Sequence, residues 1–200
     1  MNKSSTKPKG ATSCKQTAFG TIPRSQLLQL EIEGVKNGLE YIATNYHESV
    51  TPQLILKIHE LAFAWIFPDW AGRYRIIRVE YSGKEAPLPH KVPALVTNLC
   101  DDLTERLKHL DHAQIAQIIE LLAWFQHRFV WIHPFQDYNG RLARMITTLI
   151  LLQLGVPPIE IKADTKKDRN NYLQAMYSAD DGDYSKLENL IKKALDEALS

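Results

Sequence analysis

The stretch WIHPFQDYNGRLAR, from Trp131 to Arg144, lies between two apolar segments with helical spacing, residues 111–133 and 141–155. Because the residue before a proline disfavours helical backbone, the first helix is predicted to end at His133. An Asn-Gly pair is typical of a β-turn. The helical periodicity on both sides predicts instead a helix–loop–helix, in which Gly140 and Arg141 open the second helix. The chain is therefore predicted to be mainly α, with this loop between two central helices.

Further helices are predicted on both sides of this pair. Residues 27–46 carry apolar side chains at helical spacing, namely Leu28, Ile32, Val35, Leu39 and Ile42. The segment 51–67 opens with Thr51 as N-cap and Pro52 in the first turn. One helix is expected after Pro93, and two more at Thr165–Ser178 and Asp183–Leu199. Gly155 and the prolines after it are predicted to end the helix that follows the loop.

One short β-hairpin interrupts this helical pattern. Ile76, Ile77 and Val79 form a β-branched stretch that is followed by a Ser82-Gly83 turn. The first 20 residues are polar and are predicted to form a flexible tail. At 200 residues and 44% hydrophobic content, the remaining segment 21–200 is expected to form one domain with a single core.

Composition argues against several classes of partner. The net charge of +1 gives no overall field that would attract nucleic acid or a membrane surface. The basic run of Arg73, Arg75 and Arg78 is short, and in a neutral protein it is interpreted as a solvated edge. The most apolar run, MITTLILLQLG, stops at Gly155 and is shorter than the ~20 residues of a membrane span. Two cysteines without metal-type spacing favour a reduced, cytoplasmic protein.

The loop combines residues that suit phosphate chemistry. Free N–H groups at a helix start, together with the helix dipole, form an anion site, and Arg141 and Arg144 fall on one face beside it. Asp137 is a candidate Mg²⁺ ligand on phosphate oxygens, and His133 is a candidate base for an incoming hydroxyl. Nucleotide chemistry is the leading hypothesis from these residues.

HPFQDYNGRLAR closely resembles the Fic-domain motif, which reads His-Pro-Phe, any residue, Asp or Glu, Gly or Ala, Asn-Gly-Arg, any two residues, Arg. The segments WAGRYR and NYLQAMYSADDGDYSKLENLI extend the resemblance over roughly Leu27 to Ile191. It implies a Fic-type helical bundle with a β-hairpin flap, and a protein adenylyltransferase that moves AMP from ATP to a hydroxyl side chain of a target protein.

The resemblance also assigns roles to individual residues. His133 would be the general base and Asp137 the Mg²⁺ ligand, while the segment Asn139, Gly140 and Arg141 would cradle the phosphates. Arg144 would contact the γ-phosphate. The hairpin would clamp the target segment by strand-like pairing, through the predicted flap residues Ile76, Ile77, Arg78, Val79, Glu80 and Tyr81.

Tyr138 departs from the family pattern, and a second resemblance assigns an inhibitory role to Glu33. Tyr138 stands where the family has Gly or Ala, so its side chain would either point into solvent or crowd the α-phosphate, and a positive φ would be costly there. Upstream, LQLEIEGVKNG resembles an inhibitory helix of one Fic class, with Gln29 in place of its Ser or Thr. By that resemblance Glu33 would pair with Arg144 and block placement of the γ-phosphate.

Three alternatives remain open at this point. The same site would remove AMP from a modified protein if Glu33 orients water, or it would transfer UMP or phosphate if Tyr138 reshapes the pocket. The chain would otherwise be a catalytically silent binding module. A homodimer is possible by resemblance, and Trp65, Phe67 and Trp70 are candidates for its interface or for the core.

Overall fold

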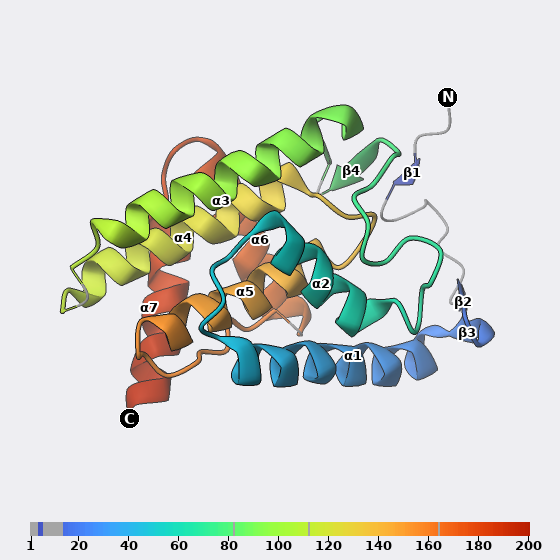
Figure 1. The fold of residues 1–200 in the computed structure, drawn as a ribbon, viewed down its shortest axis with the longest axis horizontal. Helices are drawn as coiled ribbons and strands as arrows, with labels where there is room; N and C mark the ends of the chain where they lie inside the picture. Colours follow the sequence, from blue (N-terminus) through green and yellow to red (C-terminus); the bar gives the residue numbers. More distant parts are fainter. Residues whose placement is uncertain (1–3, 6–13, 82, 112, 164) are drawn as a thin grey trace.

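The computed structural model describes residues 4–5, 14–81, 83–111, 113–163 and 165–200. These residues form a bundle of helices with short strands at one end, so the predicted class, mainly α with a β-hairpin, is confirmed (Figure 1). The helices are α1 (Arg24–Asn45), α2 (Pro52–Phe63), α3 (Val92–Lys108), α4 (Ile115–Ile132), α5 (Asn139–Gln153), α6 (Lys166–Asp180) and α7 (Ser185–Leu199), with a 3₁₀ turn at Pro89–Lys91.

Helices α4 and α5 form the centre of the bundle. α4 is buried on most of its faces, as its nearly continuous apolar sequence predicts, and it packs against α3, α5, α6 and α7. α5 packs between α4 and α1, and α2 covers its other side. In Figure 1, α3 and α4 run together along one edge of the molecule and α1 runs along the opposite edge. The loop between α4 and α5 therefore lies at the end of the core where the strands gather.

The helix ends follow the sequence signals. The Thr51 hydroxyl caps α2 by accepting a hydrogen bond from the Leu54 N–H at 3.1 Å. Thr165 caps α6 in the same way. At the end of α5, Gly155 has a φ of 69°, and the N–H of Val156 returns to the carbonyl of Leu151 at 2.9 Å. These positions confirm the predicted boundaries to within a few residues.

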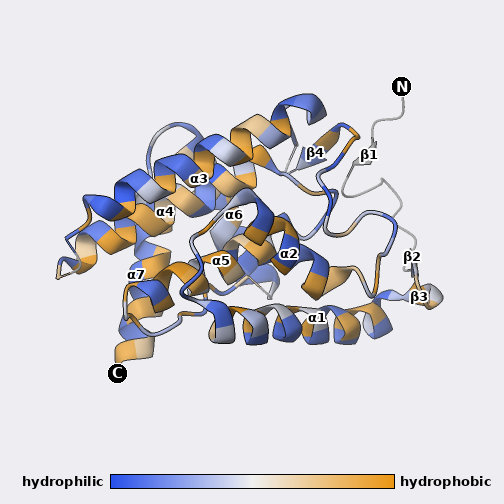
Figure 2. Cartoon of the chain, in the orientation of Figure 1, coloured by the Kyte–Doolittle hydropathy of each residue, from blue (hydrophilic) through white to orange (hydrophobic). Residues whose placement is uncertain are grey.

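The buried face of α1 differs from the predicted one. Leu27, Glu31, Gly34, Gly38 and Ile42 face the interior, which is one turn-by-turn stripe of the helix. Two residues of the predicted apolar face, Leu28 and Ile32, are exposed. Figure 2 shows apolar and polar residues alternating along α1, so hydropathy alone does not identify the buried side.

Glycine explains why α1 presents this face to α2. A Cβ atom at Gly34 would lie 2.2 Å from the carbonyl oxygen of Ala62, so only glycine permits this close approach. At Gly38 a Cβ would lie 2.8 Å from the sulfur of Met145 on α5. Close packing at these two glycines sets the rotation of α1, and that rotation turns Glu31 toward the loop.

The flap hairpin consists of β4 (Val79–Tyr81) and β5 (Lys84–Glu85), which pair antiparallel with Glu80 opposite Glu85. Of the predicted flap residues, Ile76, Ile77 and Arg78 lie before the strand, and Ile76 is 91% exposed. The edge of β4 that faces away from β5 pairs in parallel with β1 (Ser4–Ser5), so β4 is the middle strand of three.

The second hairpin comes from the predicted flexible tail. β2 (Cys14–Thr17) and β3 (Gly20–Pro23) pair antiparallel, and the Ala18 N–H donates to the carbonyl of Ile66 at 2.8 Å. Cys14 to Gly20, which the sequence analysis assigns to a flexible tail, thus belong to a hairpin in which Thr17 is buried and the turn is anchored on the segment after α2. Residues 1–3 and 6–13 of that predicted tail lie outside the described residues.

Within the described part of the chain, no helix combines the length and the apolar character needed to cross a membrane.

Candidate active site

His133 is the C-cap of α4 and has a left-handed backbone with φ 50°. Its backbone N–H still closes the last helical turn on the carbonyl of Phe129 at 3.1 Å. The ring nitrogen Nδ1 lies 3.1 Å from the carbonyl oxygen of Val130, which accepts but cannot donate. Nδ1 therefore carries the hydrogen, and Nε2 of the neutral ring is left as a proton acceptor.

The surroundings of His133 favour its neutral form. Burial lowers the pKa of His133 to about 4, and the positive charge of Arg75 adds to this effect. The ring of Tyr81, on the flap, stacks on the imidazole with centroids 4.6 Å apart and planes 9° apart. The predicted base is thus unprotonated near neutral pH and lies directly under the flap.

The side chain of Asn139 bonds to the backbone of the loop and does not point out of it. Its side-chain oxygen accepts from the Phe135 N–H and its amide donates to the Phe135 carbonyl, each at 2.9 Å. Asn139 is buried, so its contribution to an anion would be its backbone N–H at the start of α5. Gly140 follows in the first turn, and there a Cβ would meet only the end of the Arg144 side chain, at 3.6 Å. The helix start predicted at this position is confirmed.

Tyr138 adopts neither of the two orientations predicted for it. Its backbone has φ 65°, the positive value that the family's glycine would tolerate, but its side chain is 7% exposed and points into the protein. The ring stacks on Phe63 at 4.2 Å and lies near Phe67 and Trp70. The Tyr138 hydroxyl donates to Glu31 Oε1 at 2.7 Å. Ring packing and this hydrogen bond hold a backbone that is strained for a non-glycine residue.

The structure also places Trp65, Phe67 and Trp70, which were predicted to lie either at a dimer interface or in the core. Phe67 is buried and stacks on Trp70 at 4.8 Å, while Trp65 and Trp70 are partly buried against the core. Phe19 from the N-terminal hairpin covers Trp65 edge-on at 5.9 Å. Of the two roles proposed for these residues, the core role is the one that the structure supports.

Glu31, and not Glu33, is the α1 carboxylate that meets the loop. Glu31 is 1% exposed, and its Oε2 lies 2.8 Å from Nη1 of Arg141. Arg24 donates a short hydrogen bond to Oε1, alongside Tyr138. Burial raises the pKa of Glu31, but the Arg24 hydrogen bond and the Arg141 charge outweigh it, so this pKa is lowered. Glu31 is therefore held as a carboxylate.

The structure does not bring Glu33 and Arg144 together. Glu33 is about half exposed and lies 3.8 Å from Lys36, one turn along the same helix. Residues two apart on a helix are about 200° apart around its axis, so Glu31 and Glu33 face opposite sides. Arg144 instead lies over the ring of Tyr172 on α6, with its guanidinium 5.8 Å from the ring centroid.

The ion pair between Glu31 and Arg141 is close but poorly aligned. Glu31 Oε2 and Arg141 Nη1 are buried atoms without an aligned hydrogen bond to any described residue, although they are 2.8 Å apart. The Arg141 guanidinium also lies over the Tyr138 ring at 5.2 Å. The first motif arginine is thus neutralised by an internal carboxylate and keeps unused donor capacity.

Asp137 holds a cation from another part of the chain. Its Oδ2 lies 2.6 Å from Nζ of Lys15 in β2, and its Oδ1 accepts from the Tyr138 N–H at 2.7 Å. The Lys15 ammonium also lies 5.4 Å from the centre of the Tyr138 ring. In the described part of the chain, no group of three or more His, Cys, Asp or Glu side chains gathers as metal ligands. A lone, partly exposed carboxylate fits Mg²⁺ that takes its other ligands from water and phosphates.

Two residues that the sequence did not identify hold the loop in place. His59 on α2 accepts from the Gly72 N–H at 2.9 Å through Nδ1, so its Nε2–H faces the Asp137 carbonyl at 3.3 Å. The His59 ring stacks on Phe135 at 3.8 Å, and burial lowers the pKa of His59 to about 4. Arg75, predicted to lie on a solvated edge, is 4% exposed and contacts the His133 carbonyl. No local pattern in the sequence distinguishes Arg75 from Arg73.

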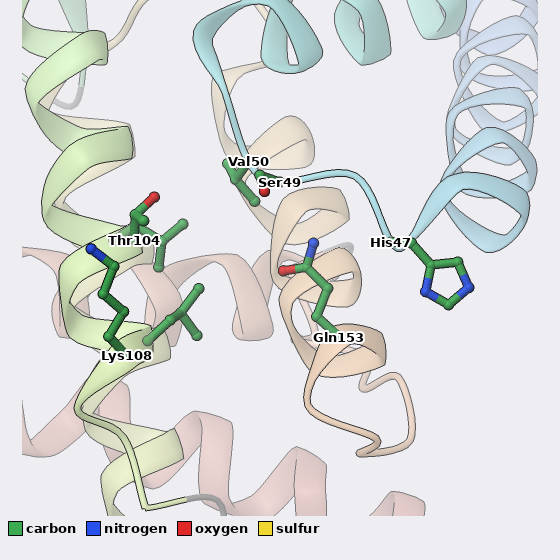
Figure 3. A pocket seen from close by; sticks show the side chains of 8 residues that line it. His47, Ser49, Val50, Thr104, Lys108 and Gln153 are labelled. Atoms are coloured by element: carbon green, nitrogen blue, oxygen red, sulfur yellow. The ribbon is translucent and has the colours of Figure 1, made fainter.

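A cleft of about 350 Å³ lies elsewhere in the molecule, between α3, the end of α5 and the α1–α2 connection. Figure 3 shows Thr104, Lys108 and Gln153 around it, while the ring of His47 points away from them. None of the motif residues lines this cleft.

The fold and the loop match known proteins. The Fic/DOC family model matches residues 49–151. Protein adenylyltransferase Fic from Nematostella vectensis is 30% identical over 171 residues, which cover 84% of this chain and 38% of that protein. The chain thus spans about two fifths of the length of that relative.

Solved structures share the fold. A Fic domain containing signaling protein from Bacteroides thetaiotaomicron has a TM-score of 0.71 at 24% identity, covering 84% of this chain and 69% of the other. BepC from Bartonella tribocorum, solved with bound AMPPNP, has a TM-score of 0.68 at 20% identity, covering 94% of each chain. With more than half of its residues matched by the family model and the motif assembled at the start of α5, this chain belongs to the Fic/DOC family.

Proposed function

We propose that this chain is a protein adenylyltransferase, which transfers AMP from ATP to a Tyr, Thr or Ser hydroxyl of a target protein. The observation that carries the proposal is the neutral His133, with Nε2 free to accept a proton, between the flap and the start of α5 at Asn139. The adenylyltransferase relative and the AMPPNP-bound structure of the same fold support the choice of ATP.

The phosphates of ATP would bind at the N-terminus of α5. The backbone N–H groups there and the positive end of the helix dipole attract anions, and Arg141 and Arg144 lie in the first two turns. Asp137 would hold Mg²⁺, which when bound neutralises charge on the phosphate oxygens. Lys15 already places a positive charge at this carboxylate, which supports Asp137 as a cation ligand.

The transfer step uses His133 as the base. Nε2 takes the proton of the target hydroxyl, and that oxygen forms a bond to the α-phosphorus while the bond to pyrophosphate breaks. The Nδ1–H bond to Val130 keeps the ring in the tautomer that this step requires. Arg141 and the helix start would stabilise charge on the phosphoryl oxygens.

The target segment would be held along β4. β4 is a short strand whose outer edge is paired by the chain's own Ser4–Ser5 in parallel register, so this edge can accept an additional strand. Peptides bind exposed strand edges mainly through their backbone. A target bound here would displace β1 and lie next to Tyr81, whose ring covers His133.

The inhibitory role assigned by resemblance to Glu33 passes to Glu31 in this proposal. Glu31 neutralises Arg141, the first arginine of the motif, from within the protein. A phosphate that binds Arg141 must compete with this carboxylate, which Arg24 and Tyr138 also hold. Removing the carboxylate is therefore expected to increase ATP binding and AMP transfer.

Intact-mass spectrometry after incubation with Mg·ATP tests the proposal on the protein itself. The comparison is between wild type, Glu31→Gln, and Glu31→Gln combined with His133→Ala. AMP on Glu31→Gln and none on the double variant is the expected result. ATP binding without transfer in all three would instead favour a silent binding module. Loss of AMP from a modified protein, abolished by Glu31→Gln, would favour the reverse reaction.

A further inference from the structure

Arg75 is a buried cation whose partners are carbonyl oxygens. It is 4% exposed, and none of the described carboxylates lies within ion-pair distance of it. Its guanidinium donates to four backbone carbonyls, those of Ile77, Pro87, Ile132 and His133, at 3.1, 2.6, 3.3 and 2.6 Å. Burying a charge is costly unless it is fully hydrogen-bonded, so this arrangement calls for a reason beyond packing.

Two of these carbonyls belong to the end of α4. The last carbonyls of a helix have no intrahelical donor and lie at the negative end of its dipole, so a guanidinium is a suitable partner. The Arg75 backbone N–H also donates to the Pro134 carbonyl at 3.0 Å. Arg75 thus binds three consecutive carbonyls, from Ile132 to Pro134. His133 lies in the middle of them, in a left-handed conformation that requires outside support.

The other two carbonyls lie at the base of the flap, where the chain enters and leaves the hairpin. Ile77 precedes β4, and Pro87 follows β5 with Ala86 between them. The Ala86 N–H donates to the Val79 carbonyl at 3.1 Å. The same guanidinium therefore joins the base of the flap to the backbone of His133. At the other end of the flap, Tyr81 stacks on the His133 ring. Flap and imidazole are connected at two points.

We propose that Arg75 is a positioning residue that holds the flap and His133 as one rigid unit, so that a target segment bound along β4 is presented in register with Nε2. This inference rests on the proposed AMP transfer for its consequence, but its structural claim does not. Arginine suits this role because its planar fork donates in several fixed directions at once. A lysine keeps the charge but has one nitrogen, which cannot reach carbonyls on both segments.

The test compares Arg75→Lys and Arg75→Met with Arg73→Met, a matched control two residues away whose side chain is exposed. Hydrogen–deuterium exchange of the flap amides and the ¹⁵N resonances of the His133 ring report the coupling directly. In Arg75→Lys, the flap amides are expected to exchange about tenfold faster, and the His133 resonances to shift or broaden. Arg73→Met should match wild type in both measurements.

Activity supplies the second readout. In the Glu31→Gln background, Arg75→Lys should lower the rate of self-transfer of AMP at saturating ATP by about 10²-fold, while the Kd for ATP stays unchanged. If Arg75→Met does not fold, Arg75→Lys alone carries the test. Flap exchange and His133 resonances in Arg75→Lys that equal those of Arg73→Met would overturn the proposal. If the Glu31→Gln protein transfers no AMP, the proposed function fails, but the exchange and resonance data still decide the coupling.

Discussion

The carboxylate of Glu31 on α1 lies 2.8 Å from the guanidinium of Arg141 on α5, and both atoms of this contact are buried. The two residues are far apart in the sequence, and the contact places a fixed negative charge at the helix start that is proposed to receive the phosphates of ATP. The affinity of the site for a nucleotide is expected to depend on whether Arg141 stays paired with Glu31.

Replacing Glu31 with Gln is expected to tighten ATP binding about tenfold, because Arg141 loses its internal counter-ion; a tenfold change corresponds to about 1.4 kcal/mol. Isothermal titration calorimetry with Mg·ATP measures this change. Glu33→Gln is the matched control, since Glu33 lies on the exposed face of the same helix. Tighter binding in Glu33→Gln and none in Glu31→Gln would restore the role that the resemblance gave to Glu33.

Replacing His133 with Ala in the Glu31→Gln background is expected to lower AMP transfer by about 10²- to 10⁴-fold, the usual contribution of a general base. Binding of Mg·ATP should persist because the helix start and both arginines remain. The rate is followed by intact mass, and the fold by thermal denaturation. A variant that keeps most of its transfer rate would exclude His133 as the base.

Acidification is expected to destabilise the protein between about pH 6.5 and about pH 4. The pKa of His133 is about 4 in the folded protein and has an ordinary value of 6.5, so the unfolded chain binds more protons in this range. The buried His59 acts in the same direction. Below this range the lowered pKa of Glu31 continues the trend, because its stabilising charge is lost on protonation.

Urea denaturation at about pH 7.5 and about pH 5 measures the effect of pH on the free energy of unfolding. Between about pH 7.5 and about pH 5, the free energy of unfolding of His133→Gln should fall by roughly 2 kcal/mol less than that of wild type. The difference arises over the about 1.5 pH units between the ordinary pKa of histidine and pH 5, where the unfolded chain binds the proton and the folded protein does not. An equal fall in both proteins would show that His133 is protonated in the folded state.

Tyr138→Phe removes the hydroxyl that donates to Glu31 and is expected to lower the free energy of unfolding by about 1–3 kcal/mol. Tyr138→Gly relieves the positive φ but removes the ring stacked on Phe63, and is expected to cost about 3 kcal/mol or more. Tyr41→Phe is the control, because Tyr41 makes the same kind of bond to Glu48 at the surface. A stabilised Tyr138→Gly would show that backbone strain outweighs the ring packing.

Lys15→Ala removes the cation that lies against Asp137 and is expected to increase Mn²⁺ affinity in the presence of AMPPNP by about two- to fivefold at low salt. The gain should shrink as ionic strength rises, because both side chains are partly exposed. Electron paramagnetic resonance of free Mn²⁺ measures it. Lys57→Ala, which breaks the surface pair with Glu60, is the control and should leave Mn²⁺ affinity unchanged.

Local patterns in the sequence predict the helices, the loop between α4 and α5, the flap hairpin and the helix end at His133. These features depend on local rules, such as the backbone before Pro134, the cap at Thr51 and the glycine at 155, which act over a few residues and are readable from them. The motif residues followed from the same stretch, because one short segment supplies all of them.

The residues that surround the loop are set by packing between distant elements. Glu31 faces Arg141 because two close-packed glycines, Gly34 and Gly38, set the rotation of α1, and a glycine face carries no hydropathy signal. Arg75 and Arg73 are alike in sequence, yet one is buried among carbonyls and the other is exposed. Rotation and burial depend on distant elements meeting in the core, and local patterns do not encode such meetings.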